Sequence, residues 1–139
     1  LELGRRRRIE DATELQHITS SKKIFEIMQP IIGELPHEEF WVLYLNNSNK
    51  VIHKSQISKG GITGTVVDSR MVFKTAFEHH ATSIVLCHNH PSGKLQASES
   101  DLFLTKKIKL AGQTLDVVVQ DHVIITEFGY LSFRDAGIF

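Results

Sequence analysis

The chain has 139 residues, of which 41% are hydrophobic, so its size and composition suit one compact domain with a buried core. Sixteen lysine and arginine residues balance sixteen acidic residues, which excludes a strongly basic nucleic-acid binder and a disordered acidic tail. The single cysteine, Cys87, excludes an internal disulfide and a thiolate metal cluster.

The first 19 residues are expected to be a linker, because they are polar and highly charged and show no sustained periodicity. Arg5–Arg8 form a basic run, which we interpret as a solvated linker or helix end rather than a specific nucleic-acid contact. The chain begins with Leu1 and not Met, so we expect it to be part of a longer protein, with residues 20–139 as its domain. No apolar run approaches the roughly 18–20 residues that span a membrane, and no signal peptide is recognisable. Together with the lone cysteine, this favours a cytoplasmic location without membrane contact.

Helical and strand patterns predict a series of short elements along the chain. In the first half they are a helix through residue 32 capped by Ser20 or Ser21, a buried strand over 40–45, a hairpin return over 51–57 after an Asn-rich turn, and a short strand near 62–67. In the second half they are a helix over 70–80 capped by Asp68 or Ser69, a strand over 82–87, a helix over 99–111 stopped by Gly112, strands over 115–119 and 123–126, and a small strand near 130–133. Strands and helices alternate through the middle, which indicates an α/β sandwich.

Two histidines and one aspartate form the main candidate site. His88 and His90 are two residues apart at the end of the strand over 82–87, so both imidazoles can face one ion. Asp101 lies in the first turn of the next helix, on the same stripe as Leu104, Thr105 and Ile108. A buried carboxylate needs a partner, and two imidazoles with one carboxylate and an open fourth position are a ligand set of catalytic zinc.

Each of these residues also has an ordinary structural explanation. Two histidines near a strand end occur without metal, and Ser98 with Asp101 reads equally well as a helix start, with Ser98 as N-cap. Glu38, just before the strand over 40–45, is the carboxylate best placed to act as a base, although it could equally be a solvated residue at a strand edge. The spacing of these residues leaves the two explanations open.

The segment His88–Gly93, followed by Ser98 and Asp101, resembles the JAMM motif of MPN-domain metalloproteases, in which ten residues (91–100) separate the second histidine from the aspartate. The flanking segments resemble the RadC branch of that family over roughly residues 20–135: His37–Leu43, Ile84–Cys87 and Asp121–Ile125. The resemblance implies an MPN fold, a cytidine-deaminase-like αβα sandwich with a mixed central sheet. Upstream of that domain, RadC-like proteins commonly carry a helix-hairpin-helix domain, and the first residues resemble its tail.

The resemblance also implies roles for individual residues. His88, His90 and Asp101 would hold Zn²⁺ with water as the fourth ligand, Glu38 would act as the general base, and Ser98 would hydrogen-bond the oxyanion. Glu39 is adjacent to Glu38, and since successive strand residues face opposite ways only one of them can address the metal; we choose Glu38. His122 recurs in RadC-like sequences without an evident role, and a packed strand histidine is the simpler interpretation.

The sequence therefore supports two functional hypotheses. The first is a zinc-dependent metallopeptidase or isopeptidase-like amide hydrolase, acting on a peptide or isopeptide-linked substrate. The alternative is a DNA-associated accessory module with a structural or vestigial metal site, in line with the family's DNA-repair label, with DNA bound through the missing N-terminal domain. The neutral net charge of the chain argues against strong phosphate binding by this domain. The string His-Asn-His is not the dispersed nuclease motif of that name, and one cysteine excludes a zinc deaminase, whose site uses a Pro-Cys-x-x-Cys element.

Overall fold

A computed structural model describes residues 15–59 and 67–139. The basic run Arg5–Arg8, and all but the last residue of the strand expected at 62–67, lie outside these ranges. The described elements follow the predicted order closely: α2 (Ser21–Ile32), β1 (Glu39–Leu45), β2 (Val51–Lys59), α3 (Ser69–Glu78), β3 (Ser83–Asn89), α4 (Glu99–Thr114), β4 (Val118–Ile125) and β5 (Tyr130–Ser132).

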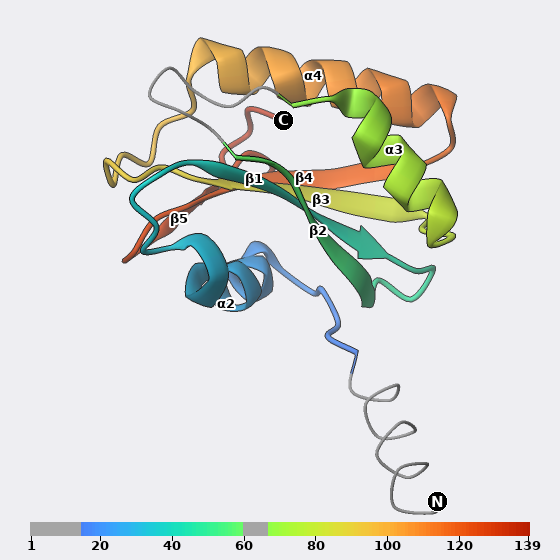
Figure 1. The fold of residues 1–139 in the computed structure, drawn as a ribbon, viewed down its shortest axis with the longest axis horizontal. Helices are drawn as coiled ribbons and strands as arrows, with labels where there is room; N and C mark the ends of the chain where they lie inside the picture. The colour runs from blue at the N-terminus through green and yellow to red at the C-terminus, as the bar shows by residue number, and fades with distance from the viewer. Residues whose placement is uncertain (1–14, 60–66) are drawn as a thin grey trace, which may run out of the picture.

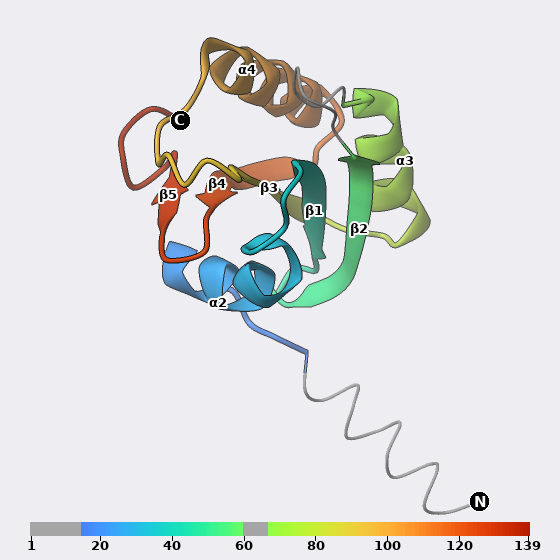
Figure 2. The same ribbon diagram turned by 60° about the vertical axis from the view of Figure 1, so that its left-hand side comes forward.

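The five strands form one mixed sheet in the order β2-β1-β3-β4-β5. β3 and β4 are parallel and the other neighbours are antiparallel. Helix α2 covers one face of this sheet, and α3 and α4 cover the other (Figures 1 and 2). The expected αβα sandwich with a mixed central sheet is therefore confirmed. None of the helices in the described ranges is long and apolar enough to cross a membrane.

A separate hydrophobic core fills each side of the sheet. On the α2 side, Ile24, Met28 and Ile32 pack against the strand residues that face α2, and Ile18 joins this core from the preceding segment. On the α3 and α4 side the core contains Phe40 among its members. Because strand side chains alternate, this second core fixes which residues of β1 and β3 face α4. His88 follows Ile84 and Leu86, which both belong to that core, at intervals of two.

The predicted end of α4 at Gly112 is wrong. The helix continues to Thr114, and Gly112 is buried inside it. A Cβ atom at Gly112 would lie 2.4 Å from the carbonyl oxygen of Val117, which leads into β4. The glycine therefore permits a close approach between the helix and the following chain, and does not act as a cap.

The two strands expected over 115–119 and 123–126 are one strand, β4. The segment between the two predicted strands, Gln120–His122, is polar, but Asp121 and His122 are buried with hydrogen-bond partners. The pairing with β3 skips Gln120: Ile84 lies opposite Val119, whereas the next residue of β3 lies opposite Asp121. This β-bulge reverses the alternation of β4, so that His122 faces the α4 side of the sheet.

Candidate metal centre

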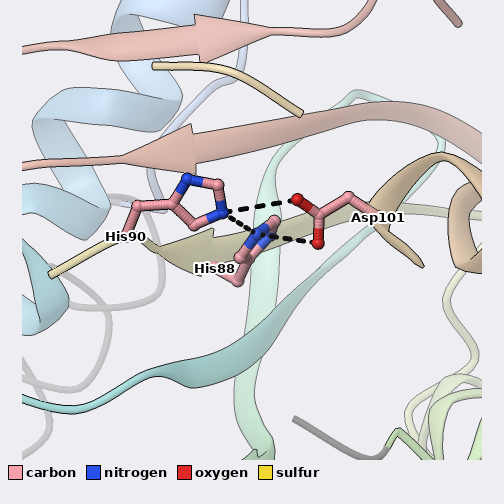
Figure 3. A group of neighbouring side chains, drawn as sticks. All are labelled: His88, His90 and Asp101. Atoms are coloured by element: carbon pink, nitrogen blue, oxygen red, sulfur yellow. Dashed lines mark hydrogen bonds and ion pairs between the residues drawn. The ribbon is translucent and has the colours of Figure 1, made fainter. Parts of the chain in front are cut away.

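Three candidate metal ligands converge at the carboxyl end of β3. Nε2 of His88 lies 2.9 Å from Nε2 of His90, and each imidazole nitrogen lies 3.3 Å from one carboxylate oxygen of Asp101. Figure 3 shows the three side chains pointing toward one another, two from the end of the strand and one from the start of α4. The structure thus brings together the three residues that the sequence proposed as ligands.

The local chain path explains why both imidazoles face the same point. His88 is the penultimate residue of β3, all of whose residues are buried. The backbone N–H of His90 donates to the carbonyl of Ile125 at 3.0 Å, which extends the parallel pairing with β4 by one rung. A tight turn then closes with a hydrogen bond from Gly93 N–H to the carbonyl of His90, and Gly93 has a φ of 80° that favours glycine. Residues at i and i+2 of an extended chain point the same way, so the turn leaves both rings at the mouth of the site.

Asp101 forms the helix cap and also faces the two histidines, so the two interpretations of the sequence do not exclude each other. Its backbone N–H donates to Oγ of Ser98 at 3.0 Å, and its Oδ2 accepts the Ser98 N–H at 2.9 Å, which together form a capping box. The same carboxylate faces both imidazoles. Burial alone would raise the pKa of Asp101, but hydrogen bonds from His88 and His90 and the charge of His88 hold it well below its usual range. The helix cap therefore fixes the position of an ionised carboxylate opposite the two histidines.

The donor set fits a tetrahedral metal ion. One ligand atom from each of the three residues lies within 4.8 Å of the other two, and among the described residues these three are the histidine, cysteine or acidic side chains whose ligand atoms meet in this way. Bonds of about 2.0–2.1 Å to a tetrahedral zinc ion imply ligand atoms about 3.3 Å apart, close to the separations found here. Two imidazoles and one carboxylate leave the fourth position for water or substrate. The triad can hold a metal, and its chemistry suits a catalytic rather than a closed structural site.

Glu38 and Glu39 lie in different surroundings. Glu38 lines the same cavity of about 820 Å³ as His88 and His90, and its negative charge raises the pKa of His90. The carboxylate of Glu39 instead contacts Nε2 of His37 at 2.7 Å and accepts a hydrogen bond from the indole N–H of Trp41 at 3.0 Å. The geometry therefore favours Glu38 as the carboxylate that can address a group bound at the metal centre.

Asn89, between the two histidines, holds the chain on both sides of Glu38. Its Oδ1 accepts the backbone N–H of Glu39 at 2.7 Å, and its Nδ2 donates to the carbonyl of His37 at 2.8 Å. The side chain is buried, so both hydrogen bonds are shielded from water. Sequence reasoning assigned no role to Asn89, because the pairing spans 50 residues and depends on β1 lying beside β3.

Ser98 also lines the cavity, at the N-cap of α4. Its Oγ accepts the N–H of Asp101 with a lone pair, so the hydroxyl proton can be donated to an acceptor inside the cavity. The five residues proposed for the site thus surround one space: the three candidate ligands, Glu38 and Ser98.

Comparison with known proteins agrees with this arrangement. The family described as "RadC-like JAB domain" matches residues 18–138 of the chain. The chain belongs to this family. The resemblance seen in the motif is therefore confirmed.

Three relatives illustrate the family. The chain is 67% identical over 139 residues to a UPF0758 protein of Flavobacterium johnsoniae, covering 100% of this chain and 61% of that protein. It is 39% identical over 139 residues to a UPF0758 protein of Porphyromonas gingivalis, covering 99% and 61%, and 36% identical over 121 residues to UPF0758 protein STH371 of Symbiobacterium thermophilum, covering 87% and 52%. The chain therefore spans about three fifths of the length of its first two relatives.

Two residues to which sequence reasoning gave no role lie behind the candidate ligands. His122 contacts Nδ1 of His88 with its Nε2 at 2.6 Å, and Thr105 contacts the other ring nitrogen of His122 at 2.5 Å. Burial and the neighbouring charge of His88 hold the pKa of His122 well below its usual value. The available signal was the polar run Gln120–His122 between apolar residues of the strand, and the sequence interpretation of His122 was a packed histidine.

In the metal-free domain, His90 is expected to stabilise the fold more at acidic than at alkaline pH. Burial opposes its protonation, but hydrogen bonds with Asp101 and the Lys94 carbonyl, with the charges of Asp101 and Glu38, outweigh this and raise the pKa of His90. A histidine whose pKa is higher in the folded chain than in the unfolded chain stabilises the fold. This contribution is complete at pH values below the unfolded pKa of about 6.5 and is lost as pH rises through the folded pKa. The difference in unfolding free energy between wild type and His90→Gln, measured by urea denaturation in chelator, should therefore shrink as pH rises. A difference that grows with pH would contradict this, and the zinc-loaded protein gives the opposite control, since metal affinity rises with pH.

Proposed function

We propose that this domain is a zinc-dependent amide hydrolase of the metallopeptidase or isopeptidase-like kind. The observation that carries the proposal is the convergence of the His88, His90 and Asp101 donor atoms within 4.8 Å, in a cavity that Glu38 and Ser98 also line. A triad with an open fourth position, a carboxylate and a hydroxyl donor are the parts that metal-assisted hydrolysis requires. Under this proposal the substrate is a peptide or an isopeptide-linked conjugate. The alternative is a DNA-associated accessory module, which would contact DNA through a further domain.

In this proposal the metal, Glu38 and Ser98 each have a different role in the reaction. When bound, zinc supplies a Lewis acid that lowers the pKa of water from about 15.7 to about 7. Glu38 accepts the proton that water loses as its oxygen forms a bond to the amide carbon, and then delivers that proton to the leaving nitrogen as the C–N bond breaks. The Ser98 hydroxyl donates to the oxygen that becomes negatively charged between these steps. Water and an amide thus yield a carboxylic acid and an amine.

The test is elemental analysis of the purified chain, followed by screening of peptide and isopeptide-linked libraries with and without chelator. We expect about one zinc per chain and hydrolysis of an amide bond that chelator abolishes and added zinc restores. Hydrolysis that persists in chelator, or a zinc-loaded chain that cleaves no amide in either library, would contradict the proposal.

The Ser98→Ala variant tests the hydroxyl donor. Loss of one oxyanion donor is expected to lower kcat about 10²–10³-fold, and loss of the N-cap to lower the unfolding free energy by about 1 kcal/mol, while zinc is retained. The matched control is Ser20→Ala, which removes the N-cap of α2 outside this cavity and should lower the unfolding free energy by a similar amount while kcat stays unchanged. Equal kcat values for wild type and Ser98→Ala would remove Ser98 from the mechanism.

A further inference from the structure

Behind His88, a line of hydrogen bonds crosses from β3 through β4 to α4. Nδ1 of His88 lies 2.6 Å from Nε2 of His122, and Nδ1 of His122 lies 2.5 Å from Oγ1 of Thr105. The Thr105 hydroxyl in turn lies 2.6 Å from the backbone carbonyl of Asp101, one helical turn earlier. The line begins at one candidate ligand and ends on the backbone of another.

The direction of every proton in this line follows from its last contact. A carbonyl oxygen carries no proton, so the single hydroxyl proton of Thr105 must be donated to Asp101. Nδ1 of His122 must then be the donor to Thr105 Oγ1. In a neutral imidazole the other nitrogen is an acceptor, so Nε2 of His122 receives the proton on Nδ1 of His88. With its Nδ1 proton donated to His122, a neutral His88 has its lone pair on Nε2, the atom that faces His90 and Asp101.

The surroundings of His122 favour this neutral state. The ring is fully buried, stacked on Phe133 with ring centroids 4.4 Å apart and in edge contact with Phe40 at 5.6 Å. A second proton on His122 would lie on its Nε2 and face His88. Nδ1 of His88 would then have to accept, and the proton of a neutral His88 would lie on its Nε2 instead. That arrangement would bury a charge and block the nitrogen that binds a metal.

We infer that His122 and Thr105 are positioning residues that hold His88 in the metal-binding tautomer and tie it to the Asp101 backbone. The inference rests on the zinc centre proposed above. Metal-bound histidines usually donate their second N–H to a carboxylate, a carbonyl or water. Here the acceptor is a neutral imidazole, and its own proton is passed on to the helix that supplies the third ligand. Two ligands from different elements are therefore oriented by one hydrogen-bonded line.

Variants of His122 that differ in hydrogen bonding separate positioning from packing. His122→Phe keeps an aromatic ring beside Phe133 but removes the acceptor, so zinc affinity measured by chelator competition should fall about 10–100-fold. His122→Gln can present an amide oxygen to Nδ1 of His88 and should recover most of the affinity. Thr105→Val, which keeps the shape and loses the hydroxyl, should weaken zinc binding, whereas Thr105→Ser should not. Circular dichroism of each metal-free variant checks that it is folded.

The ring ¹⁵N shifts of His122 and His88 give a second readout that needs neither metal nor activity. In the wild type both rings should show a protonated Nδ1, and His122 should show an unprotonated Nε2. Unchanged zinc affinity in a folded His122→Phe variant, or a protonated Nε2 on His122, would overturn the inference. Failure of the wild type to bind zinc at all would instead count against the proposed function, so the two failures are distinguishable.

Discussion

Replacement of Asp101 by alanine is expected to remove stoichiometric zinc and also to weaken the start of α4. The carboxylate lies 3.3 Å from an imidazole nitrogen of both His88 and His90, so its loss leaves two of three protein ligands. It also accepts the N–H of Ser98 in the capping box, and loss of that bond should lower the unfolding free energy by about 1 kcal/mol. Elemental analysis and denaturant unfolding of the same preparation measure the two effects separately.

Glu99→Ala is the matched control for this variant. Glu99 is an exposed acid of the same helical turn, so its loss should cost about 0.3–1 kcal/mol through the helix dipole and leave zinc binding intact. Zinc at one equivalent in Asp101→Ala would show that the carboxylate is only a helix cap. Loss of zinc in both variants would mean that the helix start, and not the carboxylate, maintains the site.

Glu38→Gln is expected to lower kcat by about 10²–10⁴-fold and to retain zinc. The amide keeps the size of the side chain but cannot accept a proton, and Glu38 lies in the wall of the cavity without being one of the three ligands. Steady-state kinetics on a cleaved peptide or conjugate, with zinc content measured in parallel, tests this expectation.

Glu39→Gln separates the two neighbouring carboxylates. Glu39 contacts His37 and Trp41, so this variant should change stability modestly and keep kcat near the wild-type value. The reverse outcome, with kcat lost in Glu39→Gln and kept in Glu38→Gln, would reassign the base.

Local patterns were sufficient to predict most of the fold. The cap at Ser20, the buried strand before the Asn-rich turn, and the alternation of strands with helices all depend on residues close together in the chain. Gly112 and β4 were mispredicted for a different reason. Gly112 must leave room for Val117, and this close approach depends on the path of the turn between α4 and β4. Asp121 accepts a hydrogen bond from the backbone N–H of Arg134, which lies 13 residues further along the chain.

The candidate site divides in the same way. His88 and His90 follow from their spacing, and Asp101 from its helical stripe. The cap and ligand interpretations of Asp101 could not be separated from the sequence, because one carboxylate oxygen takes part in both. His122 and Asn89 could not be assigned at all, since their partners lie 34 and about 50 residues away.

The extra residue in β4 has a consequence for how this site tolerates insertions and deletions. Gln120 occupies the bulge, with its amide hydrogen-bonded to Ser83 and to Asn49. Because Gln120 is the unpaired extra residue, its deletion would leave Val119 opposite Ile84, Asp121 opposite Val85 and His122 on the α4 side. One further residue inserted between Val119 and His122, with no second bulge to absorb it, would instead turn His122 toward α2. Such an insertion would remove the support of a metal centre contributed by β3 and α4 without any change in its own residues, whereas loss of Gln120 would not.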